Sequence, residues 1–419
     1  MPGFPSVNIM RIQARLQALA AIGRNAGGGI DRSFGSAADL AARKHLATLL
    51  TNEVGAAVSV DPAANIWAKI NEQSPLPAIV AGSHHDTVPN GGMYDGALGV
   101  ILAIEVLQAV KEACWPLRHP LAMVSFTAEE PNPFNLSTLG SRLATGKLTA
   151  AQLAGAEDPL QKLSLDEALT RAGGSLGNLA AARLQPGKLA AFLECHIEQG
   201  QRLDKRCLPL AAVSHITGIY RETVTVCGEA NHAGTTLMPD RRDALSAAAA
   251  FCLALEQVLR TIDREDVVGT IGRLQIYPNA VNIIPGEVSL TLEIRTPGPA
   301  VLEAVLDRLD GAVAVIEAER SVRIQRQVLL DQAAVKLDET VIAAIDGELA
   351  AAAEPYLTLT SMAGHDATHL ADVTKSGMLF VRSLNGKSHC PDEDSRLEDI
   401  EKAGNILLKT MLRLDKELD

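Results

Sequence analysis

The spacing of apolar residues predicts helices first and then a sheet. Residues Ile9 to Ile22 and Ala37 to Leu50 repeat apolar positions at helical spacing. Continuous apolar runs follow at 76–83, 119–128 and 189–198, and an apolar helical stretch at 96–114 lies between the first two. Runs that are apolar on both faces, separated by helices, are typical of a mostly parallel sheet covered on both sides.

The segment from about residue 212 to 330 has a different pattern. Residues 220–228 alternate with period two, as expected of a half-exposed strand, and a helix is expected at 240–262. Strands at 267–278 and 288–295, a helix at 299–319 and a strand at 322–330 complete the order β-α-β-β-α-β. The first pattern then resumes, with expected strands at 356–361 and 378–383.

A chain of 419 residues is long for one hydrophobic core. We therefore expect two domains of α/β class. A domain with a mostly parallel sheet would comprise residues 1–211 and 331–419, and an inserted α+β domain would comprise residues 212–330.

Composition narrows the class of function. Hydrophobic residues make up 47% of the chain, charged residues 21%, and the net charge is −12. This charge argues against nucleic acid or an anionic membrane as the main partner. The six cysteines form no CxxC pair, and the N-terminus lacks the pattern of a signal peptide, so we expect a cytoplasmic protein with reduced thiols.

Chemically active side chains follow the expected strands. Taken singly, each is typical of an ordinary turn, helix start or loop. Together, however, five of them come from distant segments and fall at one edge of the same sheet, where ligands bind in such folds. These five are His84, Asp95, Glu130, His196 and His389. Three imidazoles and two carboxylates suit divalent zinc, manganese or cobalt, so we expect a metal site in which Asp95 bridges two ions.

Glu129 remains free beside these ligands. A metal-bound water is acidified to a pKa of about 7, and an adjacent carboxylate can take its proton. We therefore expect Glu129 to be the general base. Asp86 is expected to accept the second ring N–H of His84, whereas His85 is expected to be structural. Gly91 and Gly92 are expected to let the backbone turn sharply before Asp95.

The inserted segment contributes three further candidates. Arg295 ends an expected strand and has the planar fork that suits a substrate carboxylate. His232 precedes an expected helix, and a histidine there can stabilise a developing oxyanion. Asn282 lies in the polar stretch NAVNIIPGE. A solvated surface position is the ordinary alternative for a strand-end arginine.

Seven motifs closely resemble the hydantoinase/carbamoylase branch of the M20 metallopeptidase family, and they occur in the family's order over nearly the whole chain. They are GSHHDTVPNGGMYDG, TAEE, ECHIEQG, NHAGTTLMPDRRDA, NAVNIIPGEVSLTLEIR, SMAGHDAT and GKSHCPDE. The branch includes N-carbamoyl-L-amino-acid hydrolases, allantoate amidohydrolases and β-ureidopropionases.

The resemblance implies a homodimeric di-metal amidohydrolase with a catalytic domain and an inserted lid and dimerisation domain. His84, Asp95 and His196 would bind one metal, and Asp95, Glu130 and His389 the other. Glu129 would be the base. Substrate contacts would come from the positions matching Gln199, His232, Asn282, Arg295 and His365, with His232, Asn282 and Arg295 supplied by the partner's lid.

The expected reaction is hydrolysis of the ureido C–N bond of an N-carbamoyl-L-amino acid, a small substrate that carries a carboxylate. Allantoate or ureidoglycolate, β-ureidopropionate, and an N-acyl amino acid or dipeptide remain alternatives, as does a member that binds a ureide without hydrolysing it. The chain departs from the family pattern at residues 131–134, Leu237, Met362 and Arg382. The changes at 131–134 and at Met362 border the expected pocket and therefore bear on the substrate.

Overall fold

The computed structural model describes residues 3–353 and 355–419, which divide into two compact units. Unit 1 contains the chain up to Ser214, then Lys336–Leu359 and Gly364–Asp419. Unit 2 contains His215–Val335 together with the short stretch Thr360–Ala363. The functional roles of the two expected domains, 1–211 with 331–419 and 212–330, stay predictions.

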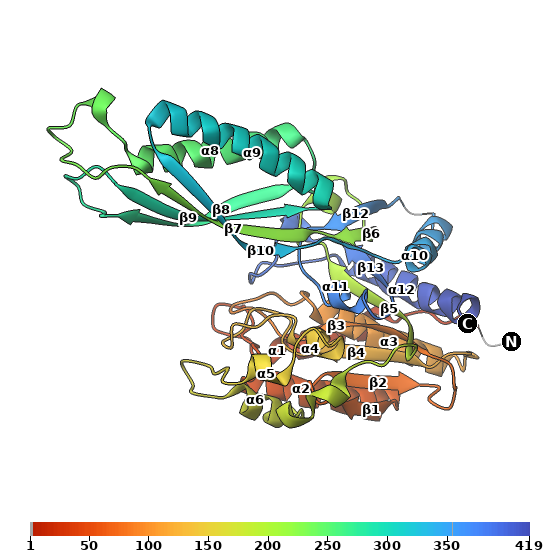
Figure 1. Ribbon diagram of the computed structural model, residues 1–419. Coiled ribbons are helices and arrows are strands. Elements are labelled where there is room, and N and C mark those ends of the chain that lie inside the picture. Colours follow the sequence, from red (N-terminus) through yellow and green to blue (C-terminus); the bar gives the residue numbers. More distant parts are fainter. Residues whose placement is uncertain (1–2, 354) are drawn as a thin grey trace. The chain divides into compact units, whose positions relative to one another are not determined.

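Unit 1 is built on a nine-stranded sheet with the order β1-β2-β4-β3-β5-β13-β6-β11, and β12 pairs with β6 (Figure 1). The four central strands, β4, β3, β5 and β13, run parallel, while β1, β2 and β6 pair antiparallel. The expected mostly parallel sheet is therefore confirmed. The strands are β1 (Ala57–Val60), β2 (Ile66–Ile70), β3 (Ala78–His84), β4 (Leu121–Phe126), β5 (Leu189–Ile197), β6 (Leu210–Ile216), β11 (Val335–Lys336), β12 (Leu357–Ser361) and β13 (Lys375–Val381).

Helices cover this sheet because its central strands are buried on both faces. The longer ones are α1 (Ile9–Ala21), α2 (Ala37–Leu49), α3 (Ala97–Glu112), α10 (Glu339–Ala351) and α12 (Leu397–Glu417). Shorter helices and turns are η1 (Leu50–Val54), α4 (Leu139–Ala144), α5 (Ala150–Leu153), α6 (Leu165–Arg171), η2 (Leu176–Ala182), α7 (Arg202–Lys205), α11 (Ala367–Leu370) and η4 (Leu384–Gly386). The expected helices at 9–22, 37–50 and 96–114 are confirmed to within two residues at each end.

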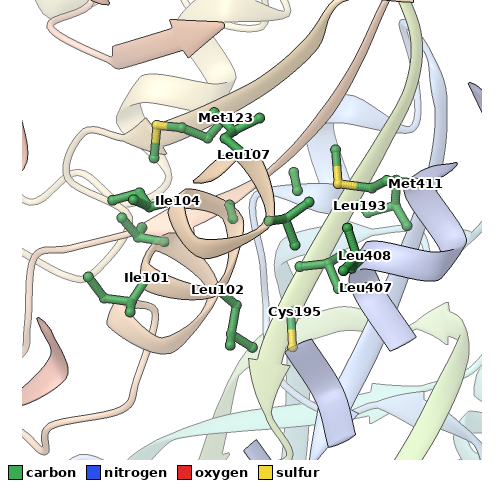
Figure 2. Close-up of a cluster of buried hydrophobic side chains, with 14 of the residues drawn as sticks. Ile101, Leu102, Ile104, Leu107, Met123, Leu193, Cys195, Leu407, Leu408 and Met411 are labelled. Carbon is green, nitrogen blue, oxygen red and sulfur yellow. The ribbon is translucent and has the colours of Figure 1, made fainter. Parts of the chain in front are cut away.

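The largest core lies between the sheet, α3 and α12. Leu102 and Leu107 of α3 and Leu407 of α12 are at most 1% exposed, and they surround Leu193 and Cys195 of β5 (Figure 2). Cys195 is therefore a packing residue, as its place beside His196 on an extended chain indicates, since neighbouring side chains of a strand point to opposite faces.

Unit 2 has the expected order β-α-β-β-α-β and forms an antiparallel four-stranded sheet with the order β10-β7-β9-β8. Its elements are β7 (Gly218–Cys227), η3 (Met238–Asp240), α8 (Ala244–Ile262), β8 (Val268–Tyr277), β9 (Glu287–Thr296), α9 (Pro299–Arg320) and β10 (Arg323–Gln332). Both helices pack on the same sheet face (Figure 1), and β7 and β9 alternate buried and half-buried residues accordingly.

Helix α8 is long and apolar enough to cross a membrane by length and composition. However, Ala247, Phe251 and Leu255 lie on one helical face and are buried against the sheet of unit 2. The helix begins four residues later than the expected 240, because Asp243 caps its N-terminus by accepting hydrogen bonds from the main-chain N–H groups of Leu245 and Ser246.

Candidate metal centre

The carboxyl ends of the four parallel strands of unit 1 bring the expected ligands together. His84 is the last residue of β3, and His196 is the penultimate residue of β5. Glu130 follows β4, His389 follows β13, and Asp95 lies just before α3. Two groups result, His84 with Asp95 and His196, and Asp95 with Glu130 and His389, each with its ligand atoms within 4.8 Å of one another. Asp95 belongs to both.

The first group, which we call the inner cluster, is buried. His84, Asp95 and His196 are 2%, 4% and 1% exposed. Oδ1 of Asp95 lies 3.6 Å from Nε2 of His84 and 3.2 Å from Nε2 of His196. Nδ1 of each ring faces a main-chain carbonyl, that of Asp86 at 3.1 Å and that of Ile197 at 2.9 Å. Each carbonyl can accept the Nδ1–H of its ring, so Nε2 is the ring nitrogen that faces Asp95.

The second group, the outer cluster, opens to solvent. Nε2 of His389 lies 3.3 Å from Oδ2 of Asp95 and 3.2 Å from Oε1 of Glu130. The His389 side chain is 48% exposed, whereas that of Glu130 is 6% exposed. Hydrogen bonds with Asp95 and Glu130 raise the pKa of His389 to about 10. In the absence of a cation, this imidazole therefore holds a proton at neutral pH.

The donor set fits divalent cations. Buried carboxylates and imidazoles that converge on one point are costly unless a positive charge lies between them, because each has lost its hydration. Burial tends to raise the pKa of Asp95, but hydrogen bonds from His196, His389 and His84 hold it well below its usual range. Burial tends to lower the pKa of His84, but Asp86, Asp95 and Glu129 raise it well above its usual value. Positive charge is thus favoured at the centre of both groups.

Glycine shapes the approach to Asp95, but not at the expected positions. Gly96 has a φ of 64°, and a Cβ there would lie 2.3 Å from the ring of His84. The turn into α3 and the close contact with the inner cluster therefore both require Gly96. The expectation for Gly91 and Gly92 was wrong in this respect, since neither has a positive φ among the residues described.

Glu129 lies beside the inner cluster without belonging to it. Its Oε2 is 3.7 Å from Nε2 of His84, and its side chain is 11% exposed. Burial and the charges of Glu130, Asp366 and Asp86 raise its pKa well above the usual value, against the opposing effect of His84. No helix begins at Glu129 in the described chain; α4 starts at Leu139, so a favourable helix dipole does not explain the acidic pair.

Asp86 and His85 make supporting hydrogen bonds next to the candidate ligands. The carboxylate of Asp86 accepts hydrogen bonds from the main-chain N–H groups of Glu129 and Glu130, at 3.2 and 3.1 Å. His84 Nδ1 is nearer to the main-chain carbonyl of Asp86 than to its carboxylate, which is 3.6 Å away. The expected partner residue is therefore present, but its carbonyl is the closer acceptor. His85 is fully buried and hydrogen-bonds Ser125 and Asp39, in agreement with a structural role.

Two expected substrate contacts also lie in unit 1. Nε2 of Gln199 is 2.7 Å from Oδ2 of Asp95 and 3.3 Å from Nε2 of His389. The His365 ring lies 4.6 Å from that of His196, centroid to centroid, and is 2% exposed. Both residues are therefore adjacent to the candidate metal ligands.

The other three candidates, His232, Asn282 and Arg295, lie in unit 2. They do not form one group there. The loops that carry His232 and Asn282 are joined, because Ala233 N–H donates to the carbonyl of Asn282 at 3.0 Å. Gly234 N–H donates to Nδ1 of His232 at 3.0 Å, so in the neutral ring the proton is on Nε2. Both candidate side chains are exposed.

Arg295 lies at the other end of this sheet. The loops with His232 and Asn282 adjoin the pair Cys227–Glu287, whereas Arg295 pairs with Ile219. At about 3.4 Å per residue, Glu287 and Arg295 are roughly 27 Å apart along the strand. Arg295 donates to Glu293 and to the carbonyl of Met362. One copy of unit 2 therefore cannot bring all three candidates to the same small substrate, contrary to the expectation that a single partner lid supplies them.

Sequence reasoning missed two buried carboxylates near the candidate ligands. Glu194, two residues before His196, is fully buried and accepts from Ser83 Oγ and Ala367 N, each at 2.8 Å. Glu393 is 5% exposed and accepts from the main chain of Asp95. An acidic residue within an apolar strand was the available signal for Glu194. Glu393 had none, because it lies in a polar loop.

Arg382, a departure from the family pattern, has a structural explanation. Its guanidinium is 5% exposed and donates two hydrogen bonds, at 2.8 and 2.6 Å, to Asp399 of α12. The pair ties the end of β13 to the helix behind it.

Comparison with known proteins agrees with this geometry. Residues 80–413 match the family described as peptidase family M20/M25/M40. An N-carbamoyl-L-amino acid amidohydrolase of Geobacillus stearothermophilus is 35% identical over 405 residues, covering 96% of this chain and 98% of that protein. A ureidoglycolate hydrolase of Arabidopsis thaliana is 32% identical and covers 98% of this chain and 87% of its own.

Solved structures show the same relationship. A hydantoinase/carbamoylase family amidase of Burkholderia multivorans superposes with a TM-score of 0.88 at 30% identity, covering 98% of both chains. Enzymes of the M20 family are typically dinuclear metal hydrolases, which the two clusters sharing Asp95 match. The chain belongs to peptidase family M20, in its hydantoinase/carbamoylase branch.

Proposed function

We propose that this protein hydrolyses the linear ureido C–N bond of an N-carbamoyl-L-amino acid. The products are the amino acid, carbon dioxide and ammonia. The observation that carries the proposal is that Asp95 belongs to both candidate clusters, while Glu129 belongs to neither and its Oε2 lies 3.7 Å from Nε2 of His84. The names of similar proteins, including the Geobacillus amidohydrolase, support the ureido substrate class.

Two divalent cations, zinc, manganese or cobalt, would be held by His84, Asp95 and His196 and by Asp95, Glu130 and His389. When bound, they would acidify a water and polarise the carbamoyl oxygen. Glu129 would accept the proton of that water and transfer it to the departing amine. Because burial raises the pKa of Glu129, bound cations would be needed to keep it ionised and able to act as a base.

The substrate carboxylate and carbonyl need separate partners. Arg295 would bind the carboxylate through its guanidinium fork, and the Nε2–H of His232, with the Asn282 amide, would donate to the carbonyl oxygen as negative charge develops. Gln199 and His365 would contact the substrate beside the metal ligands. Because one unit 2 cannot supply both Arg295 and His232, we propose a homodimer in which two copies complete each site. The six free cysteines fit a reducing compartment, and we place the enzyme in the cytoplasm.

The test is an ammonia-release screen of protein loaded with zinc, manganese or cobalt. It covers N-carbamoyl-L-amino acids, allantoate, ureidoglycolate, β-ureidopropionate and an N-acyl amino acid. We expect the highest kcat/KM with an N-carbamoyl-L-amino acid. A higher value with ureidoglycolate or allantoate would favour the second candidate, which relatives named ureidoglycolate hydrolase and allantoate deiminase support.

Glu129→Gln is the matched control in this screen. Loss of the base should lower kcat by about 10² to 10⁴-fold, while both cations stay bound because Glu129 is not a ligand. Turnover within threefold of the unmodified enzyme would contradict the role of Glu129. Two bound ions and no turnover of any ureide by the unmodified enzyme would favour a protein that binds ureides without hydrolysing them.

A further inference from the structure

We propose that Glu393 is a positioning residue that fixes the shared ligand Asp95 between the two clusters. Oε1 of Glu393 accepts hydrogen bonds from the main-chain N–H groups of Tyr94 and Asp95, at 2.7 and 3.0 Å. Nearly three hundred residues of chain separate the partners. Glu393 thereby holds the backbone of Asp95 against the loop that carries His389.

A second contact reaches the carboxylate of Asp95 itself. The hydroxyl of Ser388 lies 2.8 Å from Oδ2 of Asp95 and 3.0 Å from Oε2 of Glu393. A hydroxyl has one hydrogen to donate, so it can donate to only one of these oxygens at a time. Glu393 thus holds the Asp95 backbone directly, and through Ser388 it adds to the contacts that Gln199 and His389 make with Oδ2 of Asp95.

Gly92 provides independent evidence for this contact. A Cβ at Gly92 would lie 2.2 Å from both Cδ and Oε1 of Glu393. The backbone at Gly92 does not have a positive φ, so the absence of a side chain there serves close approach rather than a turn. Gly92, the second glycine of the pair before Asp95, thus makes room for Glu393.

The consequence concerns both cations, because Asp95 is the ligand that the clusters share. Partners behind a metal ligand typically change metal affinity by 10- to 100-fold when removed. Glu393 also contacts Ser388, the neighbour of His389, so its loss should loosen the outer cluster along with Asp95. This inference rests on the metal centre of the proposed function, but not on the identity of the substrate.

The experiment measures metal affinity of the purified full-length protein by competition with a chromophoric chelator. Asp415 supplies the matched control. It is also buried and near the C-terminus, and Oδ1 accepts from the main-chain N–H groups of Arg118 and His119, at 3.0 and 2.7 Å. That contact lies before β4, whereas the metal ligands follow the strand ends, so Asp415→Ala tests loss of a similar buried carboxylate away from the site.

We expect Glu393→Ala to weaken zinc binding at least tenfold and Asp415→Ala to change it less than twofold. Glu393→Gln should stay within threefold, because its oxygen can still accept both N–H groups and its amide can donate to Ser388. Equal affinity in Glu393→Ala and the unmodified protein, or equal losses in Glu393→Ala and Asp415→Ala, would overturn the proposal.

If Glu393→Ala does not fold, Ser388→Ala and Gly92→Ala replace it. Each should weaken zinc binding at least threefold, and unchanged affinity in both would overturn the proposal. These measurements need no turnover. A protein that binds two ions through this network but hydrolyses no ureide would refute the proposed function and leave the role of Glu393 intact.

Discussion

The inner and outer clusters share Asp95 but differ in how firmly their other ligands are held. The imidazoles of His84 and His196 are buried, and the Nδ1 atom of each faces a main-chain carbonyl. His389 is half-exposed, on a loop, with a φ of 57°. The inner cluster is therefore preorganised before a cation arrives, whereas the outer cluster has the exposure that allows water and substrate to enter. Loss of ligands should consequently affect the two clusters unequally.

The largest effect is expected where the clusters overlap. Asp95→Ala should remove the ligand common to both, so neither cation is retained and kcat/KM falls by at least about 10³-fold, since the reaction loses its activated water. Metal content after dialysis and ammonia release measure this. Asp392→Asn is the control, because that carboxylate lies in the loop of His389 but is paired with Lys387 at the surface. Retention of two ions by Asp95→Ala would show that the clusters do not depend on a shared ligand.

A smaller, asymmetric effect distinguishes the clusters. His196→Ala and His389→Ala should each lose one cation, but only His196→Ala should lower the Tm of the metal-free protein by several degrees. His196 is buried against His365, and its removal leaves a cavity, whereas His389 is half-exposed. Equal Tm losses in the two variants would remove the difference in rigidity on which the comparison rests.

The smallest effect is in proton release. With its pKa raised to about 10, His389 is protonated at neutral pH in the metal-free protein and must lose that proton to bind a cation. The apparent affinity of the outer cluster should therefore rise with pH up to about 10. Calorimetry at pH 7 in buffers of different ionisation enthalpy should show about one proton fewer released by His389→Ala than by the unmodified protein. If both proteins released the same number of protons on binding metal, His389 would already be neutral in the metal-free protein.

Much of the fold followed from local patterns. The buried strands β3, β4 and β5 are apolar runs, and the alternation in 220–228 correctly indicated a half-buried strand in unit 2. The order of elements in unit 2 was also predicted correctly. Strand pairing could not be predicted in the same way, because hydrophobic periodicity contains no information on which strands are neighbours. Nothing in the residues around 360 indicated that Thr360–Ala363 packs with unit 2.

The candidate ligands were identified from residue type, strand ends and family resemblance, but of the residues that support them only Asp86 was predicted. The sequence showed a glycine pair before Asp95, and only the structure showed that Gly96 provides the positive φ and Gly92 the space for Glu393. Arg295 and His232 were grouped as one set of substrate contacts until strand register placed them at opposite ends of the same sheet.

By itself, the sequence determined the class of fold, the family, and the kinds of donor atom available for a metal, because these depend on side-chain chemistry and short-range periodicity. Only the tertiary structure decided which imidazole faces solvent and which buried groups hold the candidate ligands. Those features depend on contacts between segments hundreds of residues apart, such as Glu393 with Asp95, and no local pattern encodes such a contact.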